Sequence, residues 1–253
     1  MNNSPPIALV TGGAKRIGAA IVKHLASHGF QVAIHTHKSV IEAEELSYNI
    51  CMAGGHARVF SSDLSTTFGE GLIEDINQTM GPVRLLVNNA SLFIDDHIGR
   101  LDAQIWEDHF AVHTAAPVFL SDAMARLLPK ECDGLIVNII DQRVLKLNPR
   151  FISYTLSKSA LWTATRTLAQ ALAPRIRVNA IGPGPSLKSY RQDDEEFEKQ
   201  AQKVLLQHGP DLSEFGETIS YFWQAKSVTG QMIALDGGQH LNWQTPDIID
   251  IKE

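Results

Sequence analysis

Short apolar runs alternate with longer helix-like segments along most of the chain, and this alternation constrains the fold more than any other feature. Seven runs are rich in β-branched residues and mostly lack apolar–polar alternation, as is typical of strands covered by helices on both faces. Several intervening segments, such as Arg16–His28 and Ile41–Met52, end near a glycine. We therefore predict an α/β protein with a single doubly wound parallel sheet and helices on both faces. The predicted strands are Ile7–Thr11, Gln31–His35, His56–Phe60, Leu85–Asn88, Gly134–Ile139, Ile176–Ala180 and Met232–Leu235.

The 253 residues contain no Pro- or Gly-rich linker, internal repeat or low-complexity tract, so we expect one domain over residues 1–253. Residues 182–208 follow the sixth predicted strand and include the acidic cluster Asp193–Glu196, which we interpret as a solvated helix start. Because ligands bind beyond the carboxyl ends of parallel strands, residues 182–208 are a candidate lid over a substrate. The tail at residues 241–253 has no evident role within one subunit.

Composition narrows the possible partners. A net charge of -6 disfavours nucleic acid as the main partner, although it is compatible with one anionic cofactor held by a local basic patch. The two cysteines, Cys51 and Cys132, have no metal-like spacing, and we expect no metal site. Residues Met1–Pro6 do not resemble a secretory signal, and no apolar run approaches the roughly 18–20 residues that span a bilayer. We expect a cytoplasmic protein with no membrane partner.

A glycine-containing turn separates the first predicted strand from the first predicted helix, over Thr11–Gly18 (TGGAKRIG). Gly12 permits a tight turn, and Gly18 allows the helix to pack closely on the strand. The backbone N–H groups at the start of the helix then face a pyrophosphate. A turn in this position predicts a dinucleotide site, and the alternative is a plain strand–helix connection.

The residues after the second predicted strand indicate which dinucleotide binds. NAD sites usually place Asp or Glu there, whereas the 2′-phosphate of NADP needs cations and hydrogen-bond donors. Here the chain reads HTHKS over His35–Ser39, and the first carboxylate is Glu42. Lys38 and Ser39 precede a helix, where an anion is favoured, and Arg16 adds a second cation. We therefore predict NADP(H), while the two histidines alone are equally compatible with a polar loop.

Tyr154 and Lys158 lie four residues apart at the start of a long predicted helix, so they share one face. An ammonium close to a phenol favours tyrosinate, so we expect Lys158 to lower the pKa of Tyr154 and to let it exchange a proton with a substrate near neutral pH. Two other strand ends add polar groups. Asp63-Leu64 suits the edge of an adenine, and Asn88–Ser91 is expected near the nicotinamide.

From its glycine turn to the Asp-Gly-Gly at 236–238, the chain resembles the short-chain dehydrogenase/reductase family. Three further family motifs occur here as Asn88–Ala90, the Tyr154/Lys158 pair and Pro183-Gly184. The resemblance implies a Rossmann fold and hydride transfer from a nicotinamide, with Tyr154 as acid/base and Lys158 holding the ribose. The cofactor-binding residues expected from the motifs and the resemblance together are Gly12, Lys15, Arg16, Ile17, Gly18, His35, His37, Lys38, Ser39, Asp63, Leu64, Asn89, Ala90, Ser91, Tyr154, Lys158, Pro183, Gly184 and Ser186.

Three positions depart from the usual family pattern. Arg16 stands in place of a glycine, Asp141 in place of the serine that precedes the tyrosine, and His113 in place of an asparagine. Arg16 and Asp141, with the segments NASLF (89–93), HTHKS (35–39) and GPGPS (182–186), resemble the pteridine and dihydromonapterin reductases within the family. His113 is expected to weaken the family's proton-relay water chain, and its alternative is a helix residue that only satisfies backbone groups.

Pterin chemistry gives the aspartate a role. A pterin ring offers both donors and acceptors, so Asp141 can accept from the ring and, with its pKa raised by burial, relay a proton through Tyr154. Phe93 can stack on the ring, and Arg16 can approach its oxygen or the cofactor phosphates. The alternative for Asp141 is a structural strand-end residue salt-bridged to Arg143. The expected catalytic residues are Asp141, Tyr154 and Lys158, and the expected substrate-binding residues are Arg16, Ser91, Phe93, Asp141 and Tyr154.

The segment Phe110–Leu128 is apolar around nearly its whole predicted helical circumference, which indicates a second apolar contact besides the sheet. A symmetric subunit interface is the simplest such contact, and the resemblance implies a homotetramer, with a dimer left open. The tail residue Trp243 is a candidate to reach a neighbouring subunit's site.

The favoured function is therefore an NADPH-dependent reduction of a 7,8-dihydropterin or folate to the tetrahydropterin. A carbonyl or enoyl reductase of the same fold, acting on an unrelated metabolite, is the nearest alternative. A nucleotide-sensing protein without catalysis is a remote one, because Tyr154 and Lys158 are both present.

Overall fold

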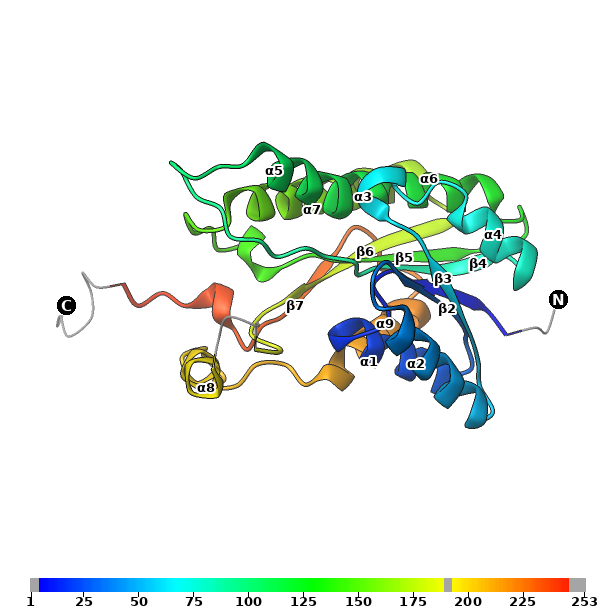
Figure 1. The fold of residues 1–253 in the computed structure, drawn as a ribbon, viewed down its shortest axis with the longest axis horizontal. Coiled ribbons are helices and arrows are strands. Elements are labelled where there is room, and N and C mark those ends of the chain that lie inside the picture. Colours follow the sequence, from blue (N-terminus) through cyan, green and yellow to red (C-terminus); the bar gives the residue numbers. More distant parts are fainter. Residues whose placement is uncertain (1–4, 189–192, 246–253) are drawn as a thin grey trace.

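The computed structural model describes residues 5–188 and 193–245. In these residues the protein forms one parallel sheet with the strand order β3-β2-β1-β4-β5-β6-β7 (Figure 1). All seven predicted strands are confirmed. Five differ from the predicted bounds. β1 ends one residue earlier than predicted, β2 and β3 end one residue later, and β4 begins two residues earlier. β6 continues to Pro183 because β7 pairs with it as far as Pro183 and Leu235. The strands are β1 Ile7–Val10, β2 Gln31–Thr36, β3 His56–Ser61, β4 Val83–Asn88, β5 Gly134–Ile139, β6 Ile176–Pro183 and β7 Met232–Leu235.

Helices cover both faces of this sheet, which confirms the doubly wound architecture. Alternate residues of β1 pack toward opposite layers: Ala8 and Val10 contact the layer with α1 and α9, and Ile7 and Leu9 contact the layer with α4 and α6. Because both faces are buried, the strand is apolar throughout. Figure 1 shows α1 (Arg16–Ser27), α2 (Val40–Met52) and α9 (Leu212–Gln224) on one face, and α3 (Leu64–Thr67), α4 (Leu72–Thr79), α5 (Ala103–Phe110), α6 (Ala116–Leu127) and α7 (Ile152–Leu172) on the other.

The apolar segment Phe110–Leu128 is not one regular helix. A π-helical turn, η1 (Ala111–Ala115), joins α5 to α6, and the Ala116 N–H donates to the carbonyl five residues back. Pro117 follows directly and has no N–H to continue a regular α-helical ladder. On the outer face of α6, Phe119 is 57% exposed.

After β6, residues 184–188 are described, residues 189–192 of the predicted lid lie outside the described residues, and the next helix is α8 (Asp194–Gln202). Asp193 caps this helix in a reciprocal capping box with Glu196, so the acidic cluster is a helix start as predicted. A short 3₁₀ turn, η3 (Gln239–Leu241), begins the tail, and Asn242 accepts a hydrogen bond from Lys146 at 2.8 Å through its backbone oxygen. Trp243 is exposed, and the predicted tail beyond residue 245 lies outside the described residues. Within the described ranges, no helix is both long and apolar enough to cross a membrane.

Candidate active site

The glycine turn at the end of β1 is shaped by close backbone contacts. Gly12 has a φ of +61°, and a Cβ there would lie 2.9 Å from Ala90 Cα. A Cβ on Gly18 would lie 2.2 Å from the Gly12 carbonyl oxygen, so only glycine fits. The Asn89 side-chain amide donates to the carbonyls of Thr11 and Gly12 at 2.9 and 3.0 Å, which fixes the turn against the end of β4.

His35 supports the turn from inside the protein. Its Nδ1 accepts the Gly12 N–H at 3.3 Å, and its Nε2 lies 3.2 Å from the Ser62 carbonyl oxygen. These partners require the tautomer with the proton on Nε2. Burial lowers the pKa of His35 to about 4, so the ring is neutral at pH 7. His35 is 2% exposed, and its role in the structure is to hold the turn rather than to present a cation.

The other residues predicted after β2 and β3 line a cavity of about 530 Å³ beside the turn: His37, Lys38, Ser39, Asp63 and Leu64. Asp63 caps α3 by accepting from the Ser65 N–H at 2.9 Å, and hydrogen bonds from Ser65 hold its pKa below the usual range. Lys15 lines the same cavity and forms an ion pair of 2.7 Å with Glu42. The first carboxylate after β2 is thus paired with a lysine of the turn.

Two further cavities continue from this one across the carboxyl ends of the strands. A cavity of about 380 Å³ shares Gly12, Ala90 and Ser91 with the first, and a third of about 720 Å³ shares Phe93 and Tyr154 with the second. The three cavities adjoin through these shared lining residues and are together called the groove here. Its middle part brings together most of the predicted cofactor-binding residues outside the 2′-phosphate region, together with the predicted catalytic residue Asp141: Lys15, Arg16, Ile17, Gly18, Asn89, Ala90, Ser91, Asp141, Tyr154, Lys158, Pro183, Gly184 and Ser186.

Asp141 and Tyr154 meet where the middle and outer parts of the groove join. The Tyr154 hydroxyl donates to Asp141 Oδ2 at 2.8 Å, and Asp141 Oδ1 accepts the backbone N–H of Arg143 at 2.8 Å. The Arg143 Nε lies 4.0 Å from the same carboxylate. Asp141 therefore makes both contacts that were expected as alternatives: the structural contact with Arg143 and a direct hydrogen bond with the Tyr154 hydroxyl. Lys158 Nζ lies 5.8 Å from the centre of the Tyr154 ring and donates to the Ile139 carbonyl at 2.8 Å.

Burial shifts the pKa of each of these three groups in the direction that favours the neutral form of the group. Desolvation raises the pKa of Asp141, as predicted, and lowers that of Lys158 to about 8. The expectation that Lys158 lowers the pKa of Tyr154 is wrong for this structure. Burial, followed by the Asp141 charge, raises the Tyr154 pKa well above its ordinary value, and the phenol is a proton donor rather than a tyrosinate.

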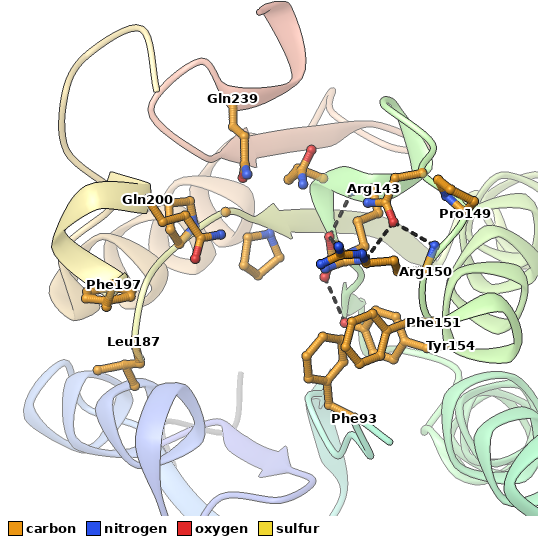
Figure 2. A pocket seen from close by; sticks show the side chains of 16 residues that line it. Phe93, Arg143, Pro149, Arg150, Phe151, Tyr154, Leu187, Phe197, Gln200 and Gln239 are labelled. Carbon is orange, nitrogen blue, oxygen red and sulfur yellow. Dashed lines mark hydrogen bonds and ion pairs between the residues drawn. The ribbon is translucent and has the colours of Figure 1, made fainter. Parts of the chain in front are cut away.

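The outer cavity has an aromatic wall beside Tyr154. Phe93 stacks on Phe151 with ring centres 4.2 Å apart and meets the Tyr154 ring edge-on at 4.8 Å. The Arg143 guanidinium lies 5.5 Å from the centre of the Phe93 ring and 5.0 Å from the centre of the Phe151 ring. Figure 2 shows this group on one side of the cavity, with Gln200 and Gln239 on the other. Phe93 thus borders the substrate space as part of an aromatic stack.

Arg16 spans the groove. It has a φ of +54°, and its guanidinium donates to the carbonyls of Leu187 and Lys188 at 3.4 and 3.0 Å. The glycine turn is thereby tied to Leu187 and Lys188, in the segment that follows β6.

A ladder of histidines and serines was not predicted. His113 Nε2 accepts the Leu92 N–H at 2.9 Å, and its Nδ1 lies 2.8 Å from Ser157 Oγ. One turn earlier, His109 repeats this arrangement with the Ile94 N–H and Ser153, at 3.3 and 2.6 Å. Both histidines are fully buried, and together they attach the loop carrying Ser91 and Phe93 to the helix carrying Tyr154. In the sequence, the only signal for this ladder is the equal four-residue spacing of the two histidines, 109 and 113, and of the two serines, 153 and 157. His113 does satisfy a backbone group, as the alternative interpretation expected.

Comparison with known proteins agrees with this site. Residues 6–199 match the model of the short chain dehydrogenase family. Dihydromonapterin reductase of Citrobacter koseri is 31% identical over 245 residues, which cover 94% of this chain and 98% of that protein. The Escherichia coli K12 enzyme of the same name is 29% identical over 248 residues, covering 95% and 100%.

Two solved structures are closer in sequence. FolM alternative dihydrofolate reductase 1 from Brucella canis, complexed with NADP, is 60% identical, has a TM-score of 0.95, and the match covers 97% of this chain and 98% of that one. The Brucella suis protein, also in complex with NADP, has the same identity and TM-score, with 98% and 100% covered. With its glycine turn, its Tyr154/Lys158 pair and the matched family model, the chain belongs to the short-chain dehydrogenase family.

Proposed function

We propose that the protein is an NADP(H)-dependent pteridine reductase that converts a 7,8-dihydropterin or dihydrofolate to its tetrahydro form. The observation that carries the proposal is the 2.8 Å hydrogen bond between Tyr154 and Asp141 at the junction of the groove with a cavity of about 720 Å³. An acidic group paired with the tyrosine suits a substrate that takes up a proton on nitrogen. The relatives named dihydromonapterin and dihydrofolate reductase support this substrate class.

The inner groove fits NADPH. Gly12 and Gly18 leave room that a Cβ would fill, and the start of α1 directs backbone N–H groups toward a pyrophosphate. Lys38 and Ser39 stand before α2 at the place for a 2′-phosphate, and the nearby Glu42 is neutralised by Lys15. When bound, NADPH supplies the hydride.

The proton comes from the protein. Asp141 holds a proton more tightly than an ordinary carboxyl because it is buried, and it shares a hydrogen bond with the Tyr154 hydroxyl. When Asp141 is protonated, its O–H donates to the Tyr154 oxygen, the reverse of the bond in the structure. Tyr154 then gives its own proton to a ring nitrogen and takes the proton of Asp141, which becomes a carboxylate. Lys158 is assigned to the ribose hydroxyls, and its buried ammonium lies 5.8 Å from the centre of the Tyr154 ring. Ser91 and Arg16 line the middle of the groove, where they contact the ring or the cofactor.

An assay of NADPH oxidation with 7,8-dihydromonapterin, 7,8-dihydrobiopterin and dihydrofolate tests the function, with NADH run in parallel. We expect turnover of at least one dihydropterin and a preference for NADPH. The variant Asp141→Ser separates this function from a carbonyl or enoyl reductase, because it restores the residue that the family usually has. A pteridine reductase then loses most of its turnover. Failure to reduce any of the three compounds, together with reduction of simple carbonyls by the Ser variant, refutes the proposal.

We also propose that residues 182–208 act as a lid, since Phe197 and Gln200 of α8 line the outer cavity. The assembly proposed is a cytoplasmic homotetramer with a dimer as the alternative. An apolar depression of the surface lined by Phe68, Phe110, Val118 and Phe119 supports an interface at α6. Light scattering of the wild type and of Phe119→Asp tests the assembly, and an unchanged mass in the variant counts against this interface.

A further inference from the structure

The outer part of the substrate cavity is lined by cations. Arg143 and Arg150 line the cavity of about 720 Å³ that reaches Tyr154. Lys146 and Lys203 line an adjoining cavity of about 270 Å³. The two cavities adjoin, and together they are called the outer cleft. Four residues with side-chain amides line both of them: Gln142, Asn148, Gln200 and Gln239.

Carboxylates are nearly missing from this cleft, although the whole chain has a net charge of -6. Among the described residues that line it, Asp141 is the only acid, and its carboxylate is bonded to Tyr154 at the inner end. The acidic start of α8 is directed to other partners. Asp194 pairs with Lys188 at 2.6 Å and Glu195 with Lys199 at 2.6 Å. The cleft is therefore a local positive region on an acidic protein.

Two of the cations are held in place by other contacts. Arg143 lies over the Phe93 and Phe151 rings and donates to Asn148 Oδ1 at 3.3 Å, which sets it beside the predicted ring site. Lys146 donates to the Asn242 carbonyl at 2.8 Å, which holds it at the outer end. Positive charge thus begins next to the aromatic wall and continues outward, with amide groups between.

We propose that this cleft is a subsite for an anionic tail, so that the enzyme selects a reduced pterin whose side chain ends in carboxylates over one with a neutral polyol. The inference rests on the proposed pteridine reductase function. A bicyclic ring at Tyr154 leaves much of the outer space open, because cavities of about 300–1,000 Å³ hold ligands of drug size. A glutamate amide fits what remains: its carboxylates meet lysine and arginine, and its amide bond meets the four side-chain amides.

Steady-state kinetics with two substrates tests the subsite. Dihydrofolate carries a glutamate tail, and 7,8-dihydromonapterin carries an uncharged polyol. In Lys146→Gln/Lys203→Gln, we expect the KM for dihydrofolate to rise about tenfold, because each exposed ion pair contributes roughly a two- to fivefold factor in affinity. The KM for dihydromonapterin and both kcat values stay within about twofold of the wild type. Arg150→Gln is expected to act in the same direction, with a smaller effect.

Lys23→Gln/Lys130→Gln is the matched control, because it removes two exposed lysines that line neither cavity. It should leave both KM values unchanged. In the wild type, added salt should weaken kcat/KM for dihydrofolate more than for dihydromonapterin. Equal changes in KM for both substrates, or no change in either, overturn the subsite while leaving the proposed reductase intact. A wild type that reduces neither substrate overturns both.

Discussion

Replacing Asp141 with asparagine tests the proposed proton relay most directly. Asparagine keeps the shape of the side chain and can still accept from the Arg143 N–H, but it removes the group that titrates and that accepts the Tyr154 hydroxyl at 2.8 Å. A hydrogen bond to a charged group contributes about 1.5–3 kcal/mol, which corresponds to a loss of about 10- to 150-fold in kcat. We expect a fall of this size with a dihydropterin, while the KM for NADPH changes less than about twofold.

The same variant should become more stable at neutral pH. Because the folded-state pKa of Asp141 is raised, its protonated form favours the folded protein, and that stability is lost as the pH rises from the unfolded value of 3.8 through the folded pKa. Asparagine imitates the protonated carboxyl at every pH. The melting temperature of Asp141→Asn should therefore exceed that of the wild type at pH 7 and approach it in acid.

The two measurements together are decisive. Turnover is followed by NADPH oxidation at several pH values, and melting by circular dichroism at pH 4 and pH 7. Unchanged kcat refutes the role of Asp141 as a proton source. A variant less stable than the wild type at pH 7 refutes the claim that burial opposes its charge. Tyr154→Phe is the companion variant, because it removes the hydroxyl that donates to Asp141 without adding a charge.

Three other predictions concern the cofactor site and the buried His35. Lys38→Asp should lower kcat/KM for NADPH by about tenfold or more and leave that for NADH nearly unchanged, since a carboxylate repels a 2′-phosphate; an equal loss with both nucleotides in steady-state kinetics would contradict it. Gly18→Ala should abolish NADPH binding measured by fluorescence, because its Cβ would lie 2.2 Å from the Gly12 oxygen, and normal affinity would show that the turn is not the pyrophosphate site. The folded-state pKa of His35 is lowered to about 4, so the contribution of its neutral ring to the free energy of unfolding is present above pH 6.5 and is lost as the pH falls. By pH 4 this loss amounts to about 3 kcal/mol. His35→Gln should flatten this part of the pH–stability curve, measured by urea denaturation.

Much of the architecture follows from local sequence. The central strands are recognisable because both of their faces are buried, so their residues are apolar without alternation. The edge strand β3 is partly exposed and is recognisable from its β-branched and aromatic residues. The glycine turn and the Tyr154/Lys158 pair are recognisable because their geometry depends on residues close in the chain. The strand ends are less predictable: Gly182 and Pro183 look like a loop, yet their pairing with β7 keeps them in the sheet.

The contacts that complete the site depend on residues far apart in sequence. Arg16 reaches carbonyls 171 and 172 positions away, and His113 bonds to Ser157, 44 positions away. No local pattern specifies such pairs, because the partner depends on how α5, α7 and the segment after β6 are packed. The exchange of asparagine for His113 indicated that the position was unusual, but only the fold reveals that the ring accepts the Leu92 N–H.

The pKa of Tyr154 shows the physical reason for the one wrong electrostatic expectation. A lysine one helical turn from a tyrosine lowers the phenol pKa if the ammonium remains charged and close. Here Lys158 is turned toward the Ile139 carbonyl, and its own pKa falls to about 8 because it is buried. Desolvation acts on Asp141, Tyr154 and Lys158 alike and disfavours the charged form of each. In water at pH 7 the three would be an anion, a neutral phenol and a cation. In the protein the carboxyl binds its proton more tightly and the ammonium holds its proton less tightly, so the gap between the pKa values of Asp141 and Lys158 is narrower than in water. The raised pKa favours the protonated form of Asp141, which is the form that the proposed relay needs in order to return a proton to Tyr154.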